Sequence, residues 1–245
     1  MIGYKAFNDD WTCRGKQYKV GENYHEDNVK MCEHGMHFCT ELKDVFGYYA
    51  YKPTMKLAKV EATGTIIGSE KDSKHVTSDL KVLEEIDPNS ETVQLVAAEK
   101  DWSAIVNIDN PNEAVQLAVV RQNGYAIQSI VNPSEVVQLA AVKQDGYSVQ
   151  FIKNPSETVQ LAAVKQNGVA IQFIDSPSED VKLAAVKQNG YAVQFLDNPS
   201  EAVQTEATKQ TGRAIQYITN PSEPVQLAAI KQTRLAINYI AKPSE

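Results

Sequence analysis

The pattern of hydrophobic and polar residues changes at about residue 87 and repeats from there onward. One proline at a fixed position of each unit marks the period, and these prolines are Pro88, Pro111, Pro133, Pro155, Pro177, Pro199, Pro221 and Pro243. The first interval between them is 23 residues, and each later interval is 22 residues. A fixed period of this length is typical of proteins built from stacked repeats. We therefore expect residues 87–245 to form a solenoid of about seven repeats.

Each 22-residue unit contains signals for two short helices. In the unit that starts at Asn154, this residue is the expected N-cap, and Glu157 is expected to complete a capping box. Residues 159–166 favour a first helix, and Gly168 predicts a left-handed stop after it. Residues 170–174 are long enough for a second helix that packs on the first. Each unit is therefore predicted to be a helical hairpin, and the solenoid to be all-α.

One stripe of the first helix is expected to face water. When the helix is drawn at about 100° per residue, Thr158, Ala162 and Lys165 share this stripe. Glu206 occupies the position of Ala162 in a later unit, which a buried stripe would not tolerate. Lys165 and Lys187 thus belong to a solvated lysine column. A nucleic-acid binder that uses this column is an alternative, but the net charge of −7 makes it unlikely.

The second helices carry a column of glutamines beside columns of aromatic residues. The candidate binding residues among them are Tyr125, Tyr147, Phe151, Gln172, Phe173, Tyr191, Phe195 and Tyr217. These side chains would form a ligand-facing strip, because large amphipathic rings are favoured at interfaces. The alternative is packing between successive repeats. We favour packing for the phenylalanines, and the two interpretations stay open for the tyrosines.

Residues 1–86 show no trace of the repeat and contain all of the histidines and cysteines. Short β-type runs such as 3–7, 36–39 and 58–62 alternate with glycine and polar turns, and 44–51 favours a short helix. We expect a compact α+β domain that caps the first unit of the solenoid.

Composition narrows the class of protein. Hydrophobic residues make up 42% of the chain, enough for a core, but no apolar run is long enough to span a membrane. The N-terminus lacks a basic-then-apolar signal region, so a cytoplasmic location is expected. Three cysteines argue against a secreted disulfide scaffold.

Both parts resemble families of unknown function. Ala-Val-Lys-Gln-Asn-Gly stands at 163–168 and 185–190. It resembles the core of short helical repeats found in phage, bacterial and protist proteins. The Gly-Tyr-Lys-Ala-Phe run at 3–7, the Cys-x-x-Gly-Met-His-Phe-Cys run at 32–39 and the Tyr-Tyr pair at 48–49 resemble an N-terminal domain of phage proteins, with Met36 where an aromatic residue is expected. The resemblance implies a phage or prophage origin and no particular activity.

Two chemical hypotheses concern the N-terminal domain. The first is a structural zinc site formed by Cys13, Cys32, His37 and Cys39, with His34 or His25 as substitutes, since thiolates and imidazoles suit zinc. Buried cysteines and ordinary histidines are the alternative. The second is an enzyme that weakly resembles ADP-ribosyltransferases, with Glu61 as its catalytic residue. The chain lacks that family's Ser-Thr-Ser segment, and no other catalytic set, such as a Ser/His/Asp triad or a Walker loop, is present.

These observations favour a non-enzymatic protein-binding module. It would use the solenoid surface, or a cleft between the solenoid and the N-terminal domain. The phage resemblance implies that the partner is a host protein, for example a defence protein, met in the host cytoplasm. No cofactor other than the zinc ion is expected, and neither a membrane nor a nucleic acid is an expected partner.

Overall fold

The computed structural model describes residues 1–240, which form two compact units. The first unit comprises residues 1–119, and the second begins at Val120, inside helix α3 (Glu113–Gln122). A sheet region is followed by regularly spaced helical hairpins, so the predicted α+β domain and α-solenoid are both present. Strand β7 ends at Ile86 and the first repeat helix begins at Glu91. The secondary structure changes from strand to helix between these two residues, and the first compact unit continues to Val119.

The N-terminal strands form a closed antiparallel arrangement. They are β1 (Ile2–Phe7), β2 (Thr12–Cys13), β3 (Lys16–Gln17), β4 (Asn23–His25), β5 (Met36–Cys39), β6 (Lys56–Gly68) and β7 (Lys74–Ile86). Strand β1 pairs with β5 and β6, and β7 also pairs with β5 and β6. The four strands therefore close on themselves as in a small barrel, while β4 pairs with β7 and β2 with β3.

Alternation along the strands fills the interior of this arrangement. The buried cluster consists of Phe7, Cys13, Tyr18, Met36, Phe38, Ala58, Val60, Ala62, Leu80 and Val82. The long strands β6 and β7 bend where their register shifts, between Lys59 and Val60 and between Thr63 and Ile66. Such irregularities increase local twist and let a short sheet close.

Within the first unit, the sheet domain contacts the first hairpin, which consists of α2 (Glu91–Lys100) and η1 (Trp102–Asn107). The short helix α1 (Leu42–Val45) lies against α2. Lys100 forms an ion pair with Asp44 at 3.3 Å, and the amide of Asn107 donates to the Tyr51 carbonyl at 3.3 Å. These contacts agree with the prediction that the N-terminal domain caps the first repeat.

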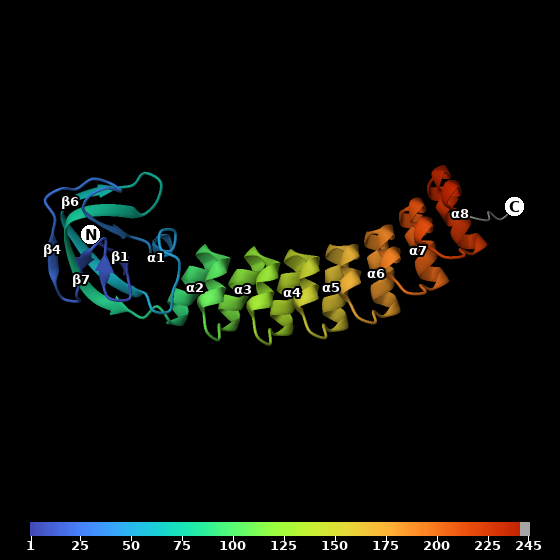
Figure 1. Ribbon diagram of the computed structural model, residues 1–245, viewed down its shortest axis with the longest axis horizontal. Coiled ribbons are helices and arrows are strands. Elements are labelled where there is room, and N and C mark those ends of the chain that lie inside the picture. Colours follow the sequence, from blue (N-terminus) through green and yellow to red (C-terminus); the bar gives the residue numbers. More distant parts are fainter. Residues whose placement is uncertain (241–245) are drawn as a thin grey trace. The chain divides into compact units, whose positions relative to one another are not determined.

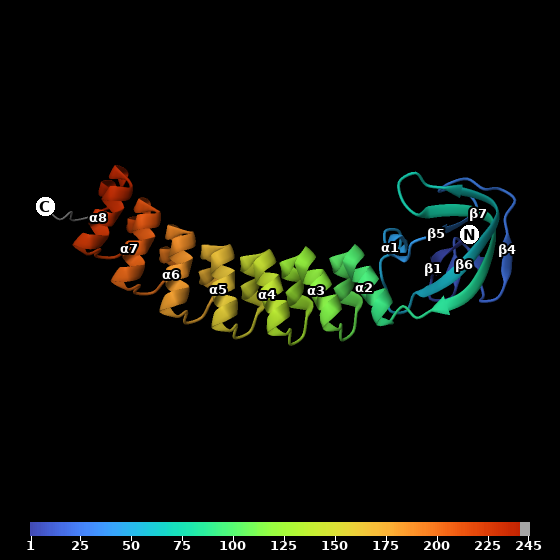
Figure 2. The same cartoon turned by 180° about the vertical axis from the view of Figure 1, so that it is seen from behind.

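Each hairpin pairs an α-helix with a 3₁₀ helix. After the first hairpin they are α3 with η2 (Gly124–Ser129), α4 (Glu135–Gln144) with η3 (Gly146–Phe151), α5 (Glu157–Gln166) with η4 (Gly168–Phe173), α6 (Glu179–Gln188) with η5 (Gly190–Phe195), α7 (Glu201–Gln210) with η6 (Gly212–Tyr217), and α8 (Glu223–Gln232) with η7 (Arg234–Tyr239). Helices α4 to α8 lie side by side in chain order (Figures 1 and 2). Pro243, the last proline of the repeat, falls outside the described residues.

The predicted helix start is wrong by two residues. The N-cap is Ser156, whose side chain accepts a hydrogen bond from the Val159 amide, and not Asn154. Asn154 instead has φ of 50°, because the following proline disfavours the α region and asparagine tolerates positive φ. Glu157 is consequently the first helical residue and forms no capping box; its carboxylate accepts from the Ser178 hydroxyl of the next hairpin at 2.5 Å.

The predicted role of Gly168 is also wrong. It begins η4 and is absent from the residues with positive φ. A Cβ atom here would lie 2.4 Å from the Ala185 carbonyl oxygen and 2.8 Å from Oε1 of Gln188. The glycine is therefore required because two hairpins approach closely. The approach also lets the Gly168 amide donate to Oε1 of Gln188 at 2.7 Å.

The interior of the solenoid repeats the same small side chains. In α5, Val159, Ala163 and Val164 are buried, as are Ala170 and Ile171 of η4. The lysines of the predicted solvent-facing stripe are exposed, as predicted; they are Lys143, Lys165, Lys187, Lys209 and Lys231. The helices thus present valine and alanine to their neighbours, which is the condition for close packing of so short a repeat.

Candidate functional site

The N-terminal domain contains a pocket of about 420 Å³ next to β1 and β5. Its cationic lining residues are Lys5, Arg14, Lys16 and Lys74, and His34 and His37 add two imidazoles. Four tyrosines also line it, namely Tyr4, Tyr18, Tyr48 and Tyr49. The combination of aromatic walls and a few convergent charged groups is typical of small-molecule sites.

Lys5 is the most buried cation of the pocket, with 4% of its surface exposed. Alternation along β1 places it on the same face as Phe7, two residues later. Its ammonium donates to the His37 carbonyl at 2.8 Å and lies 5.5 Å and 5.6 Å from the ring centroids of Phe7 and Tyr18. Burial lowers the pKa of Lys5, because the charged form loses hydration.

Arg14 and Lys74 line the pocket from two other segments. Arg14 follows β2 and donates to the carbonyls of Cys32 and Glu33, at 3.3 and 3.2 Å. The Lys74 ammonium, at the start of β7, lies 4.1 Å from the Tyr48 ring centroid and 3.5 Å from the Cys32 sulfur. Arg14 and Cys32 both have positive φ, of 51° and 66°. Such strained positions persist where the surroundings hold them.

The two carboxylates of the pocket already have cationic partners. Glu26 pairs with Lys16 at 3.3 Å and also accepts from the Gly35 amide at 3.0 Å. Glu33 pairs with Lys30 at 2.8 Å. Among residues 1–240, no ion pair involves Lys5, Arg14 or Lys74. The pocket therefore has an excess of positive charge.

The pKa of His37 is affected by this positive charge. Burial and the charges of Arg14, Lys74 and Lys5, in decreasing order, lower the pKa of His37 to about 4. Its Nε2 accepts from the Cys32 amide at 2.9 Å, so the proton of the neutral ring is on Nδ1. That nitrogen is buried without a partner at hydrogen-bond geometry, although the Gly35 backbone is near enough to affect the pKa.

The proposed zinc ligands are only partly brought together. Cys13, His37 and Cys39 line the pocket, whereas Cys32 is exposed. Cys13 contacts the Tyr49 hydroxyl at 3.6 Å, and burial raises the pKa of the Cys39 thiol to about 11. Within the described part of the chain, no three His, Cys, Asp or Glu residues are placed to hold a metal ion. The four residues do not form a preassembled tetrahedral set.

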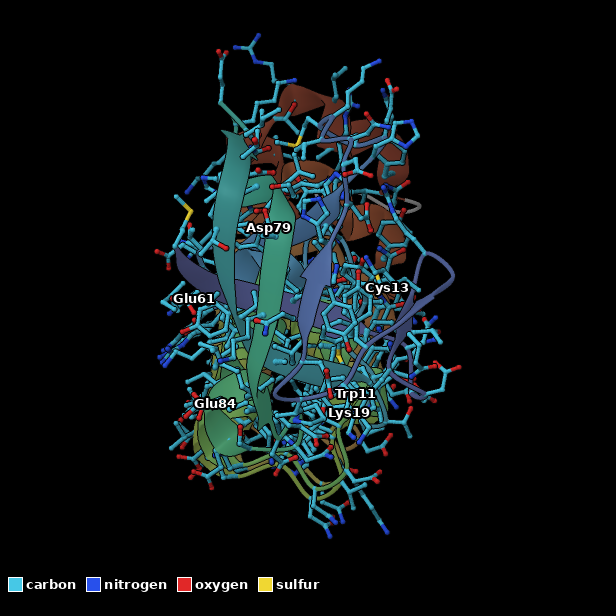
Figure 3. The ribbon with its side chains drawn as sticks, turned by 90° about the vertical axis from the view of Figure 1, so that its left-hand side faces the viewer. Trp11, Cys13, Lys19, Glu61, Asp79 and Glu84 are labelled. Atoms are coloured by element: carbon cyan, nitrogen blue, oxygen red, sulfur yellow. The ribbon has the colours of Figure 1, made fainter. Side chains whose placement is uncertain are left out.

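Glu61, the residue proposed for a transferase, lies away from the pocket. It stands on β6, opposite Ile2 of β1 and Lys81 of β7, and does not line the pocket. Glu61 and Cys13 lie on opposite sides of strand β7 in Figure 3. The structure thus does not bring Glu61 together with the pocket residues, and no observation favours a transferase.

In the second unit, the predicted aromatic residues form contacts across successive hairpins. Tyr125 meets Phe151 edge to face with centroids 5.5 Å apart, and Tyr147 meets Phe173 at 5.8 Å. Tyr191 and Tyr217 repeat the contact at 6.1 Å. The more exposed rings are Phe151, Phe173 and Phe195, each 39% exposed, and Tyr217, 46% exposed. Packing and exposure therefore coexist, and we call these four exposed rings the aromatic strip.

The glutamines beside the strip form hydrogen bonds with the backbone of their own 3₁₀ helices. Gln172 is exposed, and its amide donates to the Val169 carbonyl at 3.2 Å. Gln150 and Gln194 make the matching bonds to Tyr147 and Tyr191. The glutamines thus hold the strip's backbone, and their outer surfaces stay in solvent.

The lysine column borders shallow grooves between the α-helices. One groove, between α5 and α6, is lined by Leu161, Leu183, Lys165, Lys187 and Asp180 among others. Glu206, the other predicted contact, is partly exposed on α7. In the same helix the buried hydroxyl of Thr208 donates to the Gln204 carbonyl at 3.0 Å, so the polar substitution leaves no unsatisfied group.

Sequence reasoning found the cysteines and His37 but missed the pocket's cations. The signal for Lys5 was its position two residues before Phe7 in a β-type run, which puts both on the buried face. Arg14 and Lys74 gave no comparable signal, because they come from a turn and from a distant strand. Their convergence depends on tertiary structure.

Comparison with known proteins finds a match, which covers the N-terminal part of the chain. Residues 1–93 match a family model described as "Domain of unknown function (DUF7666)". This match supports the predicted N-terminal domain of unknown function. No curated protein and no solved structure matches the chain. No helix among residues 1–240 is both long and apolar enough to cross a membrane.

Proposed function

We propose that the repeat array is a protein-binding module and that its contact surface is the aromatic strip. The observation that carries this proposal is the regular exposure of large rings, with Phe151, Phe173 and Phe195 each 39% exposed. A lone exposed ring needs no explanation, but a row of them marks an interaction surface. Aromatic residues are also enriched among the residues that dominate binding energy.

The rings are held in place before any partner arrives. The edge-to-face contacts of Phe151 with Tyr125 and of Phe173 with Tyr147 restrict their rotamers. A restricted side chain loses less conformational entropy on binding than a free one. The tyrosines therefore act as supports, and the exposed rings as the contact residues.

The spacing of the strip favours an extended segment as the partner. Packed helices lie about 8–10 Å apart, and an extended chain advances about 3.3 Å per residue. Successive rings of the strip would therefore meet about every third residue of an extended peptide. A partner with apolar side chains at this interval fits the strip.

The resemblance of both parts to phage proteins is the basis for proposing a class of partner. It supports a bacterial host protein as the partner, met in the host cytoplasm, with a defence protein as one concrete form. The lysine column is the competing surface, because Lys165 and Lys187 border an apolar groove. A nucleic acid bound at that column would show a steep dependence on salt concentration.

The test compares two variants of the full chain in affinity capture from a bacterial lysate. One variant carries Phe151→Ala, Phe173→Ala and Phe195→Ala, and its control carries Lys143→Gln, Lys165→Gln and Lys187→Gln. We expect a stoichiometric protein on the wild-type chain, lost with the aromatic variant and retained with the lysine variant. Capture of no protein, or loss with the lysine variant alone, would contradict the proposal. Circular dichroism confirms that both variants are folded.

A further inference from the structure

The pocket of the N-terminal domain contains more positive charge than the carboxylates of the domain neutralise. Both of its carboxylates, Glu26 and Glu33, are paired with lysines. Lys5, Arg14 and Lys74 remain without a carboxylate at ion-pair distance in the described chain. Unpaired cations that converge on one concave site attract an anion, since the low local dielectric strengthens the interaction.

The three cations converge on one place. They come from β1, from the turn after β2 and from β7, yet Lys5 donates to the His37 carbonyl at 2.8 Å, Arg14 donates to the Cys32 carbonyl at 3.3 Å, and the Lys74 ammonium lies 3.5 Å from the Cys32 sulfur. The Cys32 amide in turn donates to Nε2 of His37 at 2.9 Å. His37 is thus their common neighbour in the pocket wall. Asp72 lies at the rim, where it accepts from the Tyr48 hydroxyl and from the Lys74 amide. It forms no ion pair with the Lys74 ammonium.

We propose that this pocket binds a small phosphate ester, with the phosphate among Lys5, Arg14 and Lys74 and the organic part against the tyrosines. A phosphate dianion suits three unpaired cations better than a carboxylate does, because it carries more charge and more acceptor oxygens. The guanidinium of Arg14 has five N–H donors, and those not used for the Cys32 and Glu33 carbonyls remain for the phosphate oxygens.

The dimensions and walls of the pocket fit the rest of such a ligand. Its volume of about 420 Å³ is larger than inorganic phosphate needs and lies in the range of small-molecule sites. Tyr4, Tyr18, Tyr48 and Tyr49 provide the aromatic surface. The site is independent of the aromatic strip, because every residue in it precedes the repeats.

The experiment is calorimetric titration of the full chain with four probes: phenyl phosphate, inorganic phosphate, benzoate and benzylammonium. We expect saturable binding of phenyl phosphate and weaker binding of inorganic phosphate, which lacks the ring. Benzoate should bind about tenfold more weakly than phenyl phosphate, as expected when charge-assisted hydrogen bonds are lost. Benzylammonium should not bind, because its charge is repelled.

Two variants locate the site. Arg14→Gln and Lys74→Gln should each weaken phenyl phosphate binding about tenfold, and neither residue belongs to the buried cluster. Lys59→Gln is the matched control, since Lys59 lies on β6 outside the pocket and pairs with Glu84 at 3.5 Å. In NMR spectra, the imidazole signals of His37 should shift on titration with phenyl phosphate.

The absence of saturation at millimolar phenyl phosphate would overturn the proposal. Equal binding of benzylammonium, or affinity that is unchanged in both pocket variants, would do the same. A loss of affinity in Lys59→Gln equal to that in the pocket variants would also count against it, because the effect would then be one of net charge.

Discussion

The backbone of Gly168 lies so close to Ala185 that a Cβ atom added to the glycine would be 2.4 Å from the alanine carbonyl oxygen. The same relationship recurs at Gly146 and Ala163, and at Gly190 and Ala207. The junctions that follow Gly124, Gly146, Gly168, Gly190 and Gly212 thus depend on a missing side chain, and their tolerance of substitution follows from this contact.

Gly168→Ala should destabilise the protein by about 1–3 kcal/mol, because the added methyl group forces two hairpins apart. Thermal or urea unfolding followed by circular dichroism measures the change. Arg234 occupies the equivalent position of the last described hairpin and is exposed. Arg234→Ala is therefore the control, with an expected change within about 0.5 kcal/mol. Equal stability of Gly168→Ala and the wild type would refute the close-packing account.

Gln188→Ala should cost about 1–3 kcal/mol, since the buried amide of Gly168 would lose its acceptor. Gln172→Ala is the matched substitution, because the Gln172 amide bonds to a carbonyl of its own exposed 3₁₀ helix. We expect it to be nearly neutral in the same unfolding measurement. Similar losses in the two variants would mean that the bond between hairpins has no special role.

Asn154→Val should destabilise the protein by about 1–2 kcal/mol, because a β-branched residue is strained at a φ of 50°. Asn154→Gly should be tolerated, since glycine adopts positive φ without strain. Unfolding midpoints of the two variants measure the difference. Asn154→Thr separates this account from an N-cap role: threonine would keep a capping side chain and be nearly neutral at an N-cap, whereas a β-branched residue at a φ of 50° should be destabilising like valine.

Acid should destabilise the N-terminal domain through His37. Its folded-state pKa is lowered to about 4, from an ordinary value of 6.5. Below pH 6.5 the unfolded chain therefore binds a proton that the folded chain resists until about pH 4, so stability falls across this window. Melting temperatures at pH 7 and pH 5 should differ less in His37→Gln than in the wild type. His34→Gln, at an exposed position, should leave the difference unchanged.

Thiol labelling should distinguish one cysteine from the other two. Cys32 is exposed, whereas Cys13 and Cys39 are buried and burial raises the pKa of Cys39 to about 11. A chromogenic disulfide reagent at pH 8 should react rapidly with a single thiol, and Cys32→Ser should abolish this phase. If the four proposed ligands held zinc, Cys32 would be protected until a chelator was added. Metal analysis of the purified protein gives an independent reading.

The sequence predicted the repeat and its hairpins because proline, valine and alanine recur at fixed intervals. It placed the N-cap at Asn154, since the signal for Ser156 is equally good and only the geometry of Asn154-Pro155 decides between them. At position 168, glycine is the expected residue both for a left-handed helix stop and for a close approach of two backbones, so the sequence does not distinguish them. A neighbour 17 residues away, Ala185, determines which applies.

The pocket was less accessible to prediction than the solenoid. A repeat presents the same local signal many times, whereas the pocket joins residues from β1, from the turn after β2 and from β7. Three of the proposed zinc ligands do line the pocket, because cysteine and histidine were the conspicuous residues there. The charges that dominate it are lysine and arginine, which sequence reasoning treats as solvated.

The side-chain hydrogen bonds between hairpins span nearly one period. The Gly168 amide reaches Gln188, 20 residues later, and the Glu157 carboxylate reaches Ser178, 21 residues later. Loss of residues 156–177 would therefore place Ser178 after Pro155, and every remaining donor would meet an acceptor of the same type. In-frame duplication or loss of a whole unit in the gene would create no new junction. The array is thus a structure whose length can evolve without its chemistry having to change.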